Sequence, residues 1–134
     1  MEYKSKFNLK GGHNMQIEKI KPLLFEQIKK AFHLTKKFHD ILLDHILNHE
    51  EDFKIQSAML CLNEASTCIN SASLIYFANY KKGDWTEFEE VLHKFETLNN
   101  EFINAYSINH DLQWIVLEYN SFLESYKRCE KYFN

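Results

Sequence analysis

Histidines near the end of the first long helical segment are the first candidates for chemistry. His45 and His49 are four residues apart, so on a helix they share one face, as a metal-chelating pair would, and His39 lies close to them. A dinuclear carboxylate centre in a helical bundle requires two Glu-x-x-His motifs. This chain contains one, from Glu90 to His93, on the expected outer face of its helix. We therefore expect no metal or cofactor, and we keep a metal or small-ligand site at His39, His45 and His49 as an alternative.

Glu64 is the second candidate, because it is the lone charge between Lys54 and Lys81. A partly buried carboxyl group can act in acid–base chemistry, so an enzyme with Glu64 in a bundle cavity is a second alternative. The sequence contains no Gly-x-Ser-x-Gly, no Cys-x-x-Cys and no glycine-rich phosphate loop. We therefore expect that the protein is not an enzyme.

The charge distribution argues against a nucleic-acid partner. Net charge is −3, but residues 1–37 hold nine lysines against three glutamates, whereas residues 38–134 hold sixteen acids against seven bases. A basic first helix beside acidic later helices explains this asymmetry, and a basic docking surface is the alternative. Arg128 is the single arginine, and specific recognition of bases or phosphates commonly requires several.

The stretch 55–80 is the expected core helix. It is long enough to cross a bilayer, but polar residues interrupt it, so it holds no continuous apolar window of about 18 residues. We therefore expect no membrane partner. Ala58, Ala65 and Ala72 recur every seven residues, which would let a second helix approach closely. A narrow polar strip is uncharged apart from Glu64, and it consists of Asn63, Thr67, Asn70 and Ser71.

Apolar residues at steps of three and four predict four helices, over residues 16–48, 55–80, 85–106 and 111–132. Pro22 offers a fresh start within the first helix. Short turns between long helices predict an all-α fold, an up-down-up-down antiparallel four-helix bundle, with residues 15–134 as a single domain.

The turn between the second and third helices carries the clearest local signals. Gly83 suits the left-handed position after a helix, Asp84 suits a helix cap, and Glu87 would complete a capping box. The run from Tyr80 through Gly83-Asp84 to Phe88 resembles the inter-helix turn of tetratricopeptide repeats. The resemblance covers about ten residues, nothing repeats at about 34 residues and the helices are too long. We therefore interpret it as a generic helical-hairpin turn.

Residues 1–14 have no helical period, and we expect a disordered tail. Residues 10–15 can be encoded as AAA GGA GGT CAT AAT ATG, which contains a ribosome-binding site before a start codon. Translation can therefore start at Met15 or at Met1, and the sequence leaves both alternatives open. Phe, Ile, Lys, Asn and Tyr supply 56 of 134 residues, which favours an AT-rich bacterium, or its phage or plasmid, as the source. Three cysteines and no apolar signal peptide predict a cytoplasmic protein with free thiols.

These observations favour a small regulator that binds another protein or a second copy of itself, such as an adaptor, an inhibitor, or an immunity or antitoxin-like factor. The positive argument is the weakly charged central helix. The predicted partner-binding residues are three from its polar strip and two tryptophans near the ends of the bundle: Asn63, Thr67, Asn70, Trp85 and Trp114.

Overall fold

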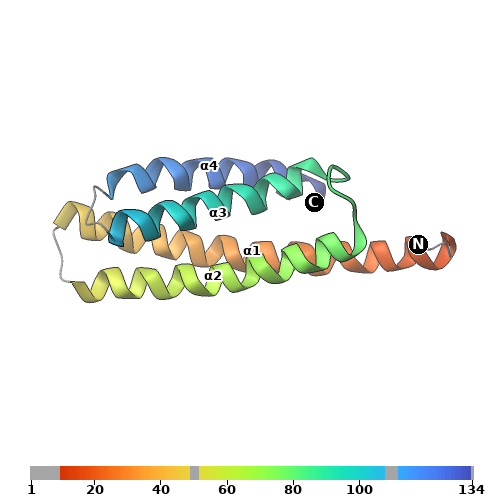
Figure 1. Ribbon diagram of the computed structural model, residues 1–134, viewed down its shortest axis with the longest axis horizontal. Helices are drawn as coiled ribbons and strands as arrows, with labels where there is room; N and C mark the ends of the chain where they lie inside the picture. The colour runs from red at the N-terminus through yellow and green to blue at the C-terminus, as the bar shows by residue number, and fades with distance from the viewer. Residues whose placement is uncertain (1–9, 49–51, 108–111, 134) are drawn as a thin grey trace.

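Four long helices lie lengthwise beside one another in alternating directions, which confirms the predicted all-α bundle (Figure 1). The computed structural model describes the backbone of residues 10–48, 52–107 and 112–133, and the side chains of residues 19–47, 55–106 and 112–133. The elements are α1 (Lys10–Asn48), α2 (Asp52–Asn79), α3 (Thr86–Ser107), α4 (Gln113–Glu130) and the short 3₁₀ helix η1 (Lys131–Phe133). The described residues contain no strand.

The bundle consists of two helical hairpins, because α1 packs most extensively on α2, and α3 on α4. Ala58, Ala65 and Ala72 of α2 are fully buried. Their small side chains let the backbones of α1 and α2 approach closely along their length. The core between the hairpins is filled by large rings, such as Phe38 against Phe102, with ring centroids 5.0 Å apart. The seven-residue alanine pattern therefore lies buried on the helix that makes the most extensive contact of the fold.

The first helix is longer than predicted. α1 runs without a break through Pro22, so the expected fresh start there is wrong. Pro22 is exposed, and the following residues Leu24 and Ile28 keep the helix anchored in the core. The helix also includes Lys10–Asn14, part of the predicted tail, whereas residues 1–9 lie outside the described residues. Its N-terminal turns project beyond the α2–α3 turn (Figure 1).

The other helices begin and end within a few residues of their predicted bounds. α2 starts at Asp52 and ends at Asn79, and α3 starts at Thr86. The final residues of the predicted fourth helix form η1 instead. Within the part of the chain that the structure describes, no helix combines the length and apolar character needed to cross a membrane.

Candidate functional site

A hydrogen-bond network joins the end of α2 to the start of α3. The Tyr76 hydroxyl donates to Glu89 Oε2 at 2.6 Å and accepts from the Trp85 backbone N–H at 2.9 Å. The same Glu89 oxygen accepts from the Gly83 backbone N–H at 2.7 Å. Burial, with the hydrogen bond to Glu89, raises the pKa of Tyr76, so the hydroxyl stays protonated and remains a donor. The network therefore ties the end of α2 to the start of α3.

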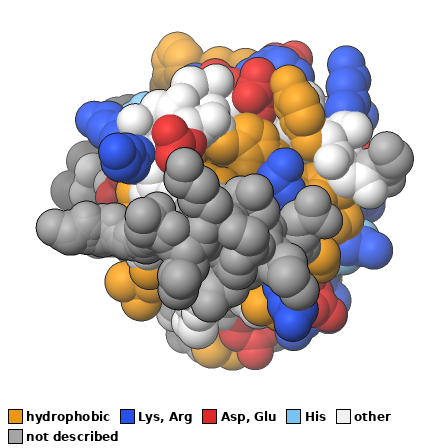
Figure 2. Space-filling model, turned by 90° about the vertical axis from the view of Figure 1, so that its right-hand side faces the viewer, with side chains coloured by type: hydrophobic (Ala, Val, Ile, Leu, Met, Phe, Trp, Pro, Cys, Tyr) orange, Lys and Arg blue, Asp and Glu red, His pale blue; other side chains and the backbone are white. Residues whose placement is uncertain are grey.

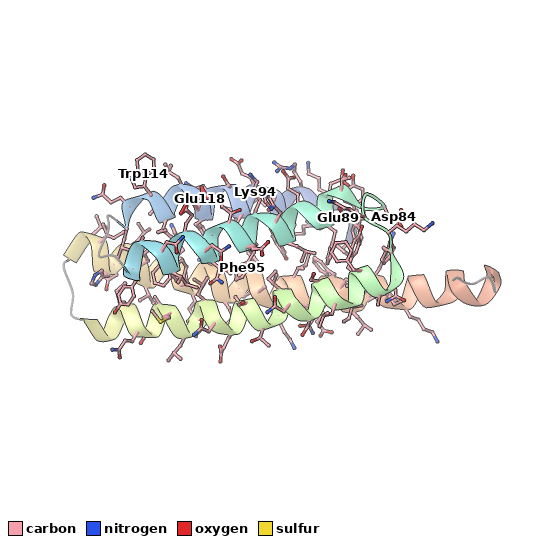
Figure 3. The ribbon with its side chains drawn as sticks, viewed as in Figure 1. Asp84, Glu89, Lys94, Phe95, Trp114 and Glu118 are labelled. Atoms are coloured by element: carbon pink, nitrogen blue, oxygen red, sulfur yellow. The ribbon has the colours of Figure 1, made fainter. Side chains whose placement is uncertain are left out.

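The predicted capping box is wrong, because Asp84 and Glu87 do not form it. Asp84 accepts from the Lys81 backbone N–H at 2.7 Å, which closes the turn before the helix. The helix begins at Thr86, later than a cap at Asp84 requires, and the carboxylate that reaches back is Glu89. Gly83 has φ +94°, which confirms the left-handed backbone, but it lies four residues beyond the end of α2. Figure 3 shows Asp84 and Glu89 together at this end of the bundle.

Aromatic rings from distant parts of the chain enclose Trp85. Its ring lies 5.0 Å from Phe88 and 5.3 Å from Phe133, and Lys21 Nζ lies 5.3 Å above it. Trp85 is buried, so its predicted role as an exposed partner-binding residue is wrong. An indole buries a large apolar area, and the turn directs it inward. Viewed on this end, hydrophobic side chains lie among lysine and acidic side chains (Figure 2).

An open groove of about 950 Å³ lies along α2 and α3. The α2 side presents Ser66, Asn70 and Ser73, whose short side chains do not fill the space toward α3. Leu92 and Phe95 of α3 are buried beneath it and supply an apolar floor. The groove therefore has short polar side chains on its α2 side and buried apolar side chains of α3 at its floor.

The rim of the groove has an excess of negative charge. Glu87, Glu89, Glu90 and Glu96 line it, against Lys82 and Arg128. Glu90 is paired with Arg128 at 3.0 Å, and Glu89 is held by the turn network. Within the described residues no ion pair reaches Glu96, which is exposed beside the exposed His93. The rim can therefore attract cationic groups.

The predicted polar strip of α2 is exposed, and it adjoins this groove. Asn63, Thr67 and Asn70 are all exposed, and Asn70 also lines the groove. Trp114 is 62% exposed but projects from α4, away from α2 and at the far end of the bundle from the α2–α3 turn (Figure 3). The structure therefore brings the three strip residues together and places Trp114 on another surface.

The alternative metal or small-ligand site lies only partly within the described residues. His39 stacks on Tyr119 with centroids 4.0 Å apart and lies 3.7 Å from Asp40, and burial lowers the pKa of His39. His45 has a buried Nδ1 without a hydrogen-bond partner, and His49 lies outside the described residues. Among the residues described, no group of three or more His, Cys, Asp or Glu side chains is placed to hold a metal ion.

The Glu64 alternative loses its premise. Glu64 is exposed and does not line the groove, so its predicted position in a bundle cavity is wrong. Cys129 is buried, and burial raises the pKa of its thiol to about 12, whereas Cys61 and Cys68 are half-buried.

Glu89 and the α3 wall of the groove were not predicted from the sequence. The acidic first turn of α3, which includes Glu87 and Glu89, was the available signal, because acids favour a helix N-terminus. This signal does not predict the hydrogen-bond partner of Glu89, since Tyr76 lies thirteen residues earlier on another helix. Comparisons of the chain with protein-family models, curated proteins and solved structures find no match.

Proposed function

We propose that this protein is a small regulator that acts by binding another protein, as adaptors, inhibitors, and immunity or antitoxin-like factors do. The observation that carries this proposal is the open groove between α2 and α3, with its apolar floor at Ile69, Leu92 and Phe95. Grooves between helices receive the apolar face of a partner helix, whose side chains insert at positions three and four residues apart. The groove is therefore the proposed binding site.

The charges of the rim define the chemistry of the partner segment. Four glutamates against one lysine and one arginine leave an excess of negative charge around an apolar floor. A matching segment carries leucine, isoleucine or a similar residue on one face and lysine or arginine beside it. We accordingly propose a basic, amphipathic segment of a partner protein as the occupant.

A synthetic peptide tests this proposal directly. A peptide of leucine and lysine of about 14 residues, or four helical turns, is titrated into the full-length protein, with binding followed by NMR and calorimetry. A second peptide has glutamate in place of each lysine. We expect the lysine peptide to bind and to shift the backbone signals of Leu92 and Phe95, with weaker binding at high salt because exposed charges are screened. The glutamate peptide is expected to bind far more weakly.

Variants of the groove separate this site from general attraction. Glu96→Gln is expected to weaken binding about two- to fivefold, as loss of an exposed ion pair does. Ser73→Trp fills the groove and is expected to abolish binding. The matched controls are Glu124→Gln and Asn120→Trp, both exposed on α4. A folded Ser73→Trp variant that binds as the wild type does, or equal binding of both peptides, would refute the proposal.

A further inference from the structure

The outward-facing line of α2 differs from the groove and carries no charge. We call it the α2 stripe. Its residues follow at steps of four and three and are Gln56, Leu60, Asn63, Thr67, Ser71, Leu74 and Ala78. All are exposed except the half-buried Ser71, and the two leucines are 66% and 75% exposed. The stripe therefore places two large apolar side chains in water along the edge of the bundle.

The outward faces of α1 and α3 carry charges, and that of α4 carries them toward its C-terminus, beyond the exposed Trp114 and Leu117. Exposed residues include Lys30 and Lys37 on α1, Glu96 and Glu101 on α3, and Lys127 on α4. A helix face that stays in water usually resembles these faces. Depletion of charge, combined with exposed leucines, is typical of the centre of a protein interface. The stripe is therefore a face that the described chain leaves without a partner.

The residues of the stripe are arranged symmetrically about Thr67. Leu60 and Leu74 each lie seven residues from it, and Asn63 and Ser71 each lie four residues from it. When two copies of α2 pack antiparallel about a two-fold axis at Thr67, Leu60 of each copy meets Leu74 of the other. Such an interface uses the same patch on both copies, which is the commonest symmetry of protein dimers.

We infer that the protein forms a two-fold homodimer through antiparallel packing of the α2 stripes, with Thr67 on the axis. The charges fit this arrangement, because Glu64, the nearest charge, lies opposite Asn70 of the other copy. The two Glu64 residues are then about 9 Å apart along the helix direction, at 1.5 Å per residue. The Thr67 hydroxyl contacts the Asn63 carbonyl oxygen at 3.3 Å within α2. Its hydrogen bond is therefore satisfied, and its methyl group can face the second copy.

The extent of the stripe suits a stable helix pair. From Gln56 to Ala78 it covers about three heptads, or roughly 33 Å of helix. The small residues Thr67, Ser71 and Ala78 allow close approach of the two helices. The groove lies to one side of the stripe, and a two-fold axis keeps both grooves on the same side of the helix pair. The dimer does not depend on the proposed groove partner.

Charge substitutions test both the contact and its direction. The 134-residue chain has a mass of 16.1 kDa, so analytical ultracentrifugation is expected to show twice that mass at high concentration. Leu60→Lys and Leu74→Glu each place charges in the interface, and each variant alone is expected to be monomeric. An equimolar mixture of the two variants is expected to dimerise, because the introduced lysine faces the introduced glutamate only in the antiparallel pairing.

Leu117→Lys provides the matched control, since Leu117 is 55% exposed on α4 and lies outside the stripe. This variant is expected to remain dimeric, and circular dichroism verifies that every variant is folded. A wild type that is monomeric at all concentrations would overturn the dimer. Dimeric Leu60→Lys protein would overturn the stripe as its interface. Monomers in the mixture would overturn the antiparallel arrangement, and none of these results bears on peptide binding in the groove.

Discussion

Replacing Tyr76 with phenylalanine removes a single oxygen atom from the centre of the α2–α3 turn. The ring of Tyr76 is fully buried, and it stacks on Phe88 with centroids 5.2 Å apart, so phenylalanine preserves the packing. The lost hydroxyl is the donor to Glu89 at 2.6 Å and the acceptor for the Trp85 N–H at 2.9 Å. The substitution therefore removes two hydrogen bonds and little apolar contact.

The expected loss is about 3 kcal/mol in the free energy of unfolding. A hydrogen bond to a charged carboxylate contributes about 1.5–3 kcal/mol, and a buried N–H left without a partner costs about 1–3 kcal/mol. Glu89 retains the Gly83 N–H as a donor, so its carboxylate is not left unpaired. The two contributions share one oxygen atom and are not independent, so the value lies within their combined range rather than at its upper end.

Urea unfolding followed by circular dichroism measures this loss. With a slope of about 1–3 kcal/mol per molar urea, the midpoint is expected to fall by about 1–3 M while the slope stays constant. Because the folded-state pKa of Tyr76 is raised above 10.0, the unfolded chain loses this proton first as pH rises. Wild-type stability is therefore expected to fall above pH 10, and Tyr76→Phe removes that share of the decline.

The exposed Tyr132 gives the control, since Tyr132→Phe is expected to change stability by less than about 0.5 kcal/mol. A double-mutant cycle of Tyr76→Phe with Glu89→Gln isolates the bond between the two side chains. The reasoning would be refuted by a loss below about 1 kcal/mol for Tyr76→Phe, or by additive effects within about 0.5 kcal/mol in the cycle.

Three further predictions follow from single residues. Gly83→Ala is expected to lower stability by about 1–2 kcal/mol in urea unfolding, because a side chain disfavours its φ of +94° although nothing lies within 4 Å of an added Cβ. The lowered folded-state pKa of His39 means that the unfolded chain binds a proton first as pH falls below 6.5, so stability decreases there, and His39→Phe is expected to lessen this decrease between pH 7 and 5. Burial and a pKa of about 12 are expected to make Cys129 the slowest thiol to react with Ellman's reagent in the folded protein, after Cys61 and Cys68.

Each of these predictions has a control in the same chain. Gly83→Asn should cost less than Gly83→Ala, since asparagine tolerates the left-handed region better. His93→Gln on the exposed face of α3 should keep the wild-type pH profile, and a profile of His39→Phe identical to the wild type would contradict the assignment to His39. Unfolding in urea should bring Cys129 to the reaction rate of the other two thiols, and a fast reaction in the folded state would contradict its burial.

The sequence by itself determined the four helices and the faces that they bury. Helical periodicity is a local property, so Leu24, Ile28, Phe95 and Phe122 could be assigned to the core from their spacing alone, and all four are buried. The strip of Asn63, Thr67 and Asn70 was likewise identified from its polarity, and its exposure was decided by the structure. The spacing of Ala58, Ala65 and Ala72 indicated a close helix contact without naming the partner, which is α1.

Only the tertiary structure decided how the turn and the edge helix are used. Trp85 is of the residue type common in surface anchors, but rings from α3 and η1 and the Lys21 side chain of α1 meet around it and bury it. The bond between Tyr76 and Glu89, and the groove of small α2 residues facing large α3 residues, depend on the separation of two helices. The physical reason is that a repeat along one helix specifies which side is buried, whereas the distance to the next helix depends on every side chain packed between them.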